Sequence, residues 1–166
     1  MLKKAFLVYW LIFSTFPLHA QTLCTEYEKI IFSFQEKKSK KLMSICRGEN
    51  PPYLVYRFGK YQNVELQFPE PLNESSWKNF EFSGMRRGGG KANAGFGDYS
   101  LSFAKGNAEY SVFQEWSDED GTYSIGINVQ ANGKSVIIPG DRKTQQGSLV
   151  LLDEENKYIK NAANPY

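Results

Sequence analysis

The stretch RRGGGKANAGFG, residues 86–97, combines two arginines and one lysine with five glycines in twelve positions. Guanidinium groups make paired hydrogen bonds with carboxylates and phosphates, and glycines let the backbone approach a ligand closely. This composition suits a phosphate cradle, a clamp for an acidic partner or a flexible connection.

A phosphate cradle is excluded by the spacing. A P-loop needs glycine, four further residues and then Gly-Lys followed by Ser or Thr, but here Ala92 follows Gly90-Lys91 and Met85 stands where the first glycine belongs. The pattern G-x-G-x-x-G is also missing, and a stretch that joins two strands offers no helix dipole to a pyrophosphate. Two interpretations stay open, a soluble glycine-rich connection and a contact loop. The candidate binding residues of the contact loop are Ser83, Gly84, Arg86, Arg87, Gly88, Gly89, Gly90, Lys91 and Asn93.

Imidazole chemistry is not expected, because the only histidine is His19. Residues 1–20 have the pattern of a cleaved secretory signal peptide, with a basic start, an apolar run at residues 5–16 and the small residue Ala20 at the end. Cleavage would remove the histidine, and with it any Ser-His-Asp triad, Cys-His pair or common zinc site. We therefore expect a protein that is not an enzyme and that uses no metal and no cofactor.

The signal pattern also predicts a periplasmic or secreted location. The apolar run is shorter than the roughly 20 residues that a membrane span needs, and we expect no span in the mature chain. Because an oxidising compartment favours disulfides, Cys24 and Cys46, the only two cysteines, are predicted to pair. Loss of Lys3 and Lys4 leaves 18 basic and 18 acidic residues, and this neutral balance argues against a nucleic-acid partner.

Two groups of carboxylates deserve comparison with known chemistry. The sequence EWSDEDG, residues 115–121, is rich in acidic groups but lacks the spacing of an EF-hand loop, so a solvated hairpin tip is the preferred interpretation. Glu65 with Glu81 or Glu109 would be needed for a glycosidase pair, yet alternation places each of these side chains on an outward-facing position.

Short runs rich in aromatic and β-branched residues, bounded by glycine, proline, asparagine or charges, are typical of strands. Asn-Gly and Asp-Gly between such runs favour hairpin turns. The predicted strands are Lys29–Gln35, Lys41–Cys46, Tyr53–Phe58, Asn63–Phe68, Trp77–Phe82, Tyr99–Phe103, Glu109–Trp116, Tyr123–Val129, Lys134–Ile138 and Ser148–Leu152.

These runs predict an all-β protein, an antiparallel meander that forms a sandwich or a barrel. A helix over residues 27–41 is the main alternative at the start, but Ile30, Phe32 and Phe34 alternate as in a strand. We expect one β domain over residues 21–155 and a frayed tail over residues 156–166.

Most of the many aromatic residues are expected to fill the core. Tyr61, Trp77, Phe96 and Trp116 lie near the ends of predicted strands, where some of them would be able to line a binding face.

Two resemblances accompany these patterns. The stretches YLVYRFGKYQNVELQFPE (residues 53–70), FSGMRRGGG and YSIGINV resemble a set of small, mostly uncharacterised exported all-β proteins of Gram-negative bacteria. A weaker likeness is to the periplasmic lysozyme inhibitors, which insert a Ser-Gly-containing loop into the acidic cleft of the enzyme. Ser83-Gly84 followed by Arg86 is similar to that loop, but Arg87 stands where a tyrosine is expected.

Together these features predict an exported β domain that binds or inhibits a protein with an acidic cleft, such as a cell-wall hydrolase or a toxin. The Ser83–Asn93 loop would be the contact. The alternative is a structural or assembly component of the cell envelope, in which this loop is only a connection.

Overall fold

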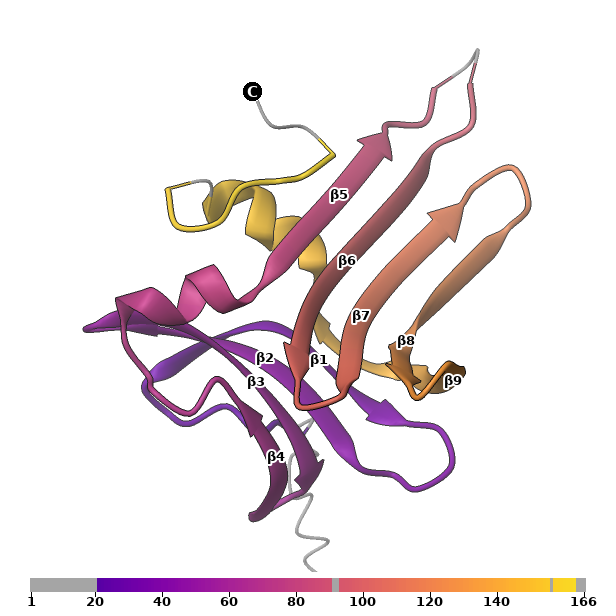
Figure 1. Ribbon diagram of the computed structural model, residues 1–166. Helices are drawn as coiled ribbons and strands as arrows, with labels where there is room; N and C mark the ends of the chain where they lie inside the picture. The colour runs from indigo at the N-terminus through magenta and orange to yellow at the C-terminus, as the bar shows by residue number, and fades with distance from the viewer. Residues whose placement is uncertain (1–20, 91–92, 156, 164–166) are drawn as a thin grey trace, which may run out of the picture.

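The computed structural model describes residues 21–90, 93–155 and 157–163 (Figure 1). The predicted signal peptide at residues 1–20 and the candidate residue Lys91 lie outside the described residues. The elements are β1 (Glu28–Glu36), β2 (Leu42–Glu49), β3 (Pro52–Lys60), β4 (Asn63–Phe68), the 3₁₀ helix η1 (Glu74–Asn79), β5 (Glu81–Arg87), β6 (Phe96–Lys105), β7 (Ala108–Ser117), β8 (Thr122–Ala131), β9 (Lys134–Gly147) and the 3₁₀ helix η2 (Leu149–Glu155).

The strands form one nine-stranded antiparallel sheet in the order β4-β3-β2-β1-β9-β8-β7-β6-β5. Neighbours in sequence pair as hairpins within each half, and β1 pairs with β9 to join the halves. At the β8–β9 turn, Asn132 and Gly133 have φ values of 52° and 72°, as the Asn-Gly hairpin pattern predicts. The predicted all-β antiparallel meander is confirmed.

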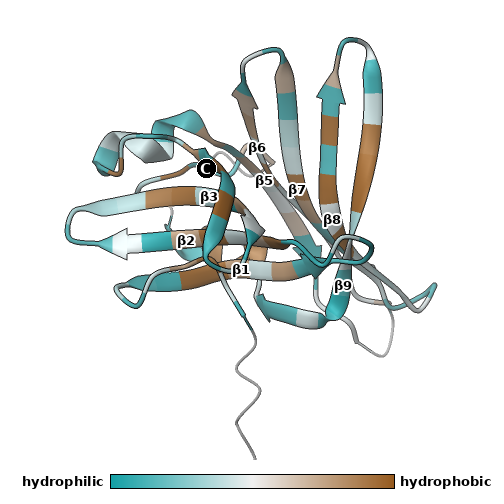
Figure 2. Cartoon of the chain, turned by 90° about the horizontal axis from the view of Figure 1, so that it is seen from below, coloured by the Kyte–Doolittle hydropathy of each residue, from teal (hydrophilic) through white to brown (hydrophobic). Residues whose placement is uncertain are grey.

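The two halves of the sheet, β1–β4 and β5–β9, face each other across the core. Phe103 of β6 stacks on Phe68 of β4 with ring centroids 4.5 Å apart, and it lies 4.9 Å from the ring of Tyr56 on β3. Brown and teal residues alternate along several strands in Figure 2, since successive side chains of a strand point to opposite faces. Many of the described aromatic residues fill the core, as expected, whereas Tyr27 and Tyr61 are exposed.

A short segment before β1 covers the outer face of the first half. It is fixed by the Cys24–Cys46 disulfide, which confirms the predicted pairing, and by a hydrogen bond of 2.9 Å from Leu23 N to Ser44 Oγ. Residues 31–34 of β1 are all buried instead of every second one. Ile31, Phe32 and Phe34 join the core, with a register shift between Ile30 and Phe32, and Ser33 Oγ bonds to Ser44 Oγ at 2.8 Å beside the covering segment.

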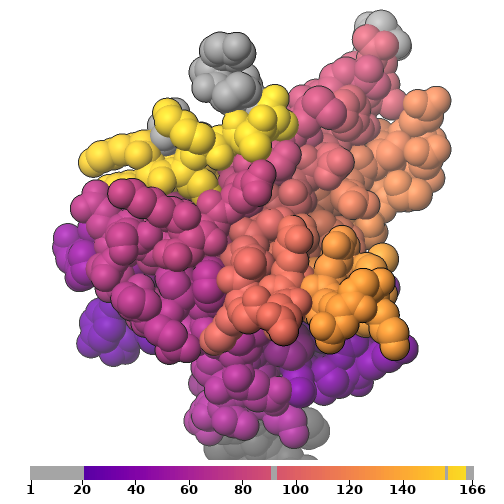
Figure 3. All heavy atoms as spheres, viewed as in Figure 1, coloured from indigo at the N-terminus to yellow at the C-terminus, as the bar shows by residue number. Residues whose placement is uncertain are grey.

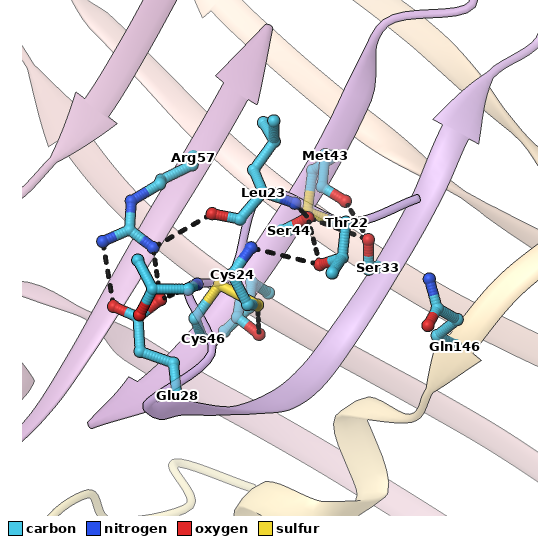
Figure 4. The surroundings of a disulfide bond; sticks show 12 residues. Thr22, Leu23, Cys24, Glu28, Ser33, Met43, Ser44, Cys46, Arg57 and Gln146 are labelled. Atoms are coloured by element: carbon cyan, nitrogen blue, oxygen red, sulfur yellow. Dashed lines mark hydrogen bonds and ion pairs between the residues drawn. A yellow bond between two sulfur atoms is a disulfide. The ribbon is translucent and has the colours of Figure 1, made fainter. Parts of the chain in front are cut away.

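Under the same segment lies a buried ion pair (Figure 4). Arg57 Nη1 and Nη2 donate to the two carboxylate oxygens of Glu28 at 2.6 and 2.9 Å, and Nη1 also donates to Leu23 O at 3.2 Å. Burial raises the pKa of Glu28, but hydrogen bonds from Arg57, the Thr25 amide and Tyr53, with the charge of Arg57, outweigh burial and hold this pKa below its usual value. The pair ties β1 to β3 and to the covering segment.

Two of the predicted strands are wrong in part or in full. Predicted strand Trp77–Phe82 begins inside η1, where Asn73 Oδ1 accepts a hydrogen bond of 2.9 Å from the Ser75 amide and caps the helix. Predicted strand Ser148–Leu152 falls largely in η2. Leu149 and Leu152 are both fully buried there, a spacing of three residues that matches one turn of a 3₁₀ helix.

The expected frayed tail is not seen for residues 157–163. Ile159 is buried, Tyr158 stacks on Trp77 with ring centroids 5.1 Å apart, and Asn161 forms a bridge to Phe82 of β5. This part of the chain packs on the sheet.

Within the described part of the chain, the helices are too short to cross a bilayer.

Candidate functional site

The β5–β6 hairpin carries the predicted contact residues and projects from the body of the protein (Figure 3). Its strands extend further than predicted, because Arg86 pairs with Gly97 and Arg87 pairs with Phe96. Residues 85–90 and Asn93 are exposed. The predicted loop is therefore a strand as far as Arg87 and a short connection after it.

Arg86 and Arg87 point to opposite faces of the hairpin, because neighbouring residues of a strand alternate. Arg86 follows Phe82 and Gly84 on the face that packs against Tyr99. Arg87 shares the other face with Met85, whose side chain is 55% exposed. The hairpin thus presents one cation on each side.

Arg87 is held in place by the hairpin itself. Its Nε donates to Ala94 O at 3.1 Å, and its guanidinium carbon lies 5.1 Å from the centre of the Phe96 ring. Nε is the only nitrogen of this guanidinium with a hydrogen bond to the described residues. Its two terminal nitrogens keep the fork geometry that binds carboxylates.

Arg86 lies beside a buried tyrosine and its carboxylate partner. Tyr99 donates its hydroxyl hydrogen bond to Asp153 Oδ2 at 3.1 Å. Burial and the Asp153 carboxylate raise the pKa of Tyr99 to about 12, while the charge of Arg86 acts in the opposite direction. Within the described ranges, Arg86 and Arg87 form no ion pair with an acidic side chain.

The outer edge of β5 is covered only in its first part. The side chain of Asn161 makes the two hydrogen bonds that a neighbouring strand would make to Gly84. Its Oδ1 accepts a hydrogen bond from Gly84 N at 2.9 Å, and its Nδ2 donates one to Gly84 O at 2.7 Å. Ala162 N donates to Phe82 O at 2.8 Å. By the same alternation, the N–H and C=O of Arg86 point to this edge, and no described residue binds them.

Ser83 and Gly84 are placed less favourably for contact than predicted. Ser83 is half-buried, and Gly84 is buried with its backbone bonded to Asn161. A Cβ at Gly84 would lie 2.4 Å from the Tyr99 ring, so this glycine lets an aromatic ring cover the strand. The exposed candidates are Arg86, Arg87, Gly88, Gly89, Gly90 and Asn93.

The tip is closed by a hydrogen bond of 2.9 Å from Gly90 N to Asn93 O. Beside this connection lies the acidic β7–β8 turn, where Asp118 N donates to Gly95 O at 2.9 Å and where a Cβ at Gly89 would lie 3.2 Å from Asp118 Oδ2. Asp118 and its two acidic neighbours, residues 119 and 120, are exposed, and Ser117 Oγ donates to Asp120 Oδ2 at 2.7 Å. In Figure 1 the β5–β6 tip extends beyond this turn. The two arginines do not, because Arg87 pairs with Phe96 and Phe96 pairs with Ser117, which places the acidic residues at least as far out as Arg87.

The acidic groups of the described residues offer little for a metal ion. The cluster with suitable ligand spacing joins Glu28 to Cys24 and Cys46, but both sulfur atoms are in the disulfide and the Glu28 carboxylate is paired with Arg57. Glu65, considered above for a glycosidase pair, forms an ion pair of 2.6 Å with Lys41.

The aromatic residues near strand ends separate into different roles. Trp77 is buried in the core, Tyr61 is 55% exposed, and Phe96 supports Arg87. Trp116 is half-buried and stacks on Tyr99 with ring centroids 5.8 Å apart.

Sequence reasoning missed Met85 and Asn161 at this site. Extension of the period-two pattern from Phe82 through Gly84 would have placed Arg86 and Met85 on opposite faces. No local signal marks Asn161, because its partner Gly84 is 77 residues away.

Comparisons of the chain with protein-family models, curated proteins and solved structures find no match.

Proposed function

We propose that this protein binds a protein partner with an acidic cleft and blocks that cleft with the β5–β6 hairpin. The observation that carries the proposal is the placement of Arg86 and Arg87 on opposite faces of a projecting, exposed hairpin. When a hairpin with one arginine on each face enters a cleft, it brings one guanidinium group to each wall of that cleft.

Enzymes that cleave polysaccharides have clefts whose walls carry carboxyl groups, which are suitable partners for guanidinium groups. Their two catalytic carboxyl groups flank the scissile bond and lie about 5–10 Å apart. Charge-assisted hydrogen bonds from two arginines would occupy both carboxyl groups and exclude the substrate. We therefore favour a cell-wall hydrolase, or a toxin with a similar site, as the partner.

The distribution of nearby charges gives the complex an orientation. The acidic turn at Asp118 to Asp120 lies to one side of the β5–β6 hairpin and at least as far out as Arg87, which is level with Ser117 in the sheet (Figure 1). Repulsion would keep this turn at the side of an acidic cleft, while Arg86 and Arg87 are attracted into it. The turn would then face the rim of the partner.

The proposal includes a periplasmic location for the protein. The signal pattern at residues 1–20 and the Cys24–Cys46 disulfide are compatible with an exported, periplasmic protein. The resemblance to periplasmic lysozyme inhibitors supports the choice of partner, although contact would here fall on residues 85–93, after Ser83 and Gly84.

The test is the lysis of cell walls by lysozyme in the presence of the purified protein. We expect inhibition by the native protein. The double variant Arg86→Ala/Arg87→Ala should raise the half-inhibitory concentration by on the order of 100-fold, because each hydrogen bond to a charged group contributes about 1.5–3 kcal/mol.

The matched control is Lys60→Ala/Lys134→Ala, which removes two exposed cations away from the hairpin. It should inhibit as well as the native protein. Equal inhibition by the arginine variant, with unchanged thermal unfolding, would rule out the hairpin as the contact. Absence of inhibition by the native protein would remove lysozyme as the partner and favour a structural role in the envelope.

A further inference from the structure

A second charged surface lies at the β1–β2 turn, which the proposed function does not use. Four of the five residues 37–41 are lysines. Lys37, Lys38 and Lys40 are exposed, and among the residues that the structure describes they form no ion pair, whereas Lys41 pairs with Glu65. We call the surface formed by residues 37–41 and 60–64 the lysine end.

The turn is shaped by an acidic residue that is hidden beneath it. Glu36 is 5% exposed and accepts hydrogen bonds from the amides of Lys38, at 2.7 Å, and Ser39. Its carboxylate is therefore occupied by the backbone. The lysine side chains above it remain exposed.

The β3–β4 turn adds apolar surface to these charges. Leu42 pairs with Gly59 in the sheet, so the residue that follows Gly59, Lys60, lies next to the lysine turn. The side chain of Tyr61 is 55% exposed and that of Val64 is 44% exposed. Cations thus lie beside a tyrosine and an aliphatic side chain at one end of the protein.

We propose that the lysine end binds the surface of a membrane that contains anionic phospholipids. Lysine is a compact charge on a flexible stem, without the fork geometry that recognises one carboxylate or phosphate. It suits a surface with many mobile anions, to which clustered lysines bind through the surface potential. Tyrosine, with an apolar ring and a polar hydroxyl, is favoured at the membrane–water interface.

A nucleic acid fits these observations less well. Its binding needs many phosphate contacts, and the formal net charge of the whole chain is only +2. Exposed Tyr61 and Val64 gain burial in a lipid interface. The inference goes beyond the proposed function and does not depend on it.

The position of the lysine end gives the inference a geometric consequence. In Figure 1 the β5–β6 tip points upward, while the β1–β2 and β3–β4 turns lie at the lower edge of the molecule. A protein bound to a membrane by its lysine end would present Arg86 and Arg87 away from that membrane.

The test is sedimentation of the protein with phospholipid vesicles. Vesicles of phosphatidylcholine mixed with phosphatidylglycerol should bind the native protein, and vesicles of phosphatidylcholine alone should not. The variant Lys37→Gln/Lys38→Gln/Lys40→Gln should lose affinity by about fivefold per lysine, on the order of 100-fold in total. The control Lys78→Gln/Lys134→Gln/Lys160→Gln removes three exposed lysines elsewhere and should bind like the native protein.

A second variant separates lipid from other polyanions. Tyr61→Ser should weaken binding to the anionic vesicles and leave any binding to a short DNA duplex unchanged. The inference is overturned if the anionic vesicles do not bind, if both lysine variants lose affinity equally, or if DNA binds as tightly as the vesicles and Tyr61→Ser affects neither.

Discussion

Arg57 and the two arginines of the β5–β6 hairpin occupy contrasting environments. Arg57 is buried and its guanidinium is shared between Glu28, Gln67 and the Leu23 carbonyl. Arg86 and Arg87 are exposed on the β5–β6 hairpin. In the first environment arginine stabilises the fold, and in the second we propose that it contacts a partner. A count of charges alone does not distinguish the two.

The sequence predicts residue-level features where few choices exist. Two cysteines allow one disulfide, and that pairing is confirmed. The partner of Arg57 was not predicted, since Glu28 is 29 residues away and many acidic residues are available. Strand alternation places Arg86 and Arg87 on opposite faces of β5 if the strand includes both residues. The glycines at residues 88–90 give no clear sequence signal for where β5 ends, so this could not be predicted.

The variant Glu28→Gln should destabilise the protein by about 3 kcal/mol at neutral pH, because it leaves Arg57 buried without its counter-charge. The folded pKa of Glu28 lies below 4.5, so its contribution is present above that value and is lost as the pH falls through the folded pKa. The difference in unfolding free energy between native protein and variant should therefore shrink on acidification. Urea unfolding at pH 7 and pH 3 measures it.

The control for this experiment is Glu81→Gln, on an exposed position of β5. Surface substitutions of this kind change stability by about 0.5 kcal/mol or less. A Glu28→Gln cost that is the same at both pH values would show that the carboxylate charge does not carry the stabilisation.

At the level of elements, periodicity predicts strands well and short helices poorly. Hairpins with glycine turns are where the pattern places them, because each turn residue and each alternating strand act locally. The helices η1 and η2 are too short for a helical stripe, and their apolar residues look like strand fragments. Long-range packing, such as the stacking of Tyr158 on Trp77, stabilises them, and their local signals, such as the cap at Asn73, are short.

The edge of β5 depends on one side chain from the C-terminal segment. Asn161→Ala removes the two hydrogen bonds to Gly84 and the bond of 3.0 Å from Nδ2 to Asp153 Oδ1. We expect a loss of about 1–3 kcal/mol and faster hydrogen exchange of the Gly84 amide. Chemical unfolding and exchange measurements would check both expectations.

Asn107→Ala is the matched control, because Asn107 is exposed at the β6–β7 turn. It should leave stability and the exchange of Gly84 unchanged. If Asn161→Ala also has no effect on either quantity, the edge of β5 is closed by other contacts.

At the scale of the whole molecule, the net charge is small, but the positive side chains are gathered in separate regions of the surface. The lysine end lies at one end of the sheet, and the arginine-bearing hairpin projects at the other (Figure 1). Fields of this kind steer association and set orientation. Sequence alone gives the number of charges but not this arrangement, because the arrangement depends on how the sheet folds over its core.

The most direct measurement is hydrogen exchange of the intact protein with and without a lysozyme-type cell-wall hydrolase. The amides from Met85 to Gly90 and from Asn93 to Phe96 should become protected on binding, including the Arg86 amide at the open edge of β5. The Arg86→Ala/Arg87→Ala variant should lose this protection at the same concentrations. Unchanged exchange in the hairpin, with protection of another surface, would contradict the assignment of the β5–β6 hairpin as the contact.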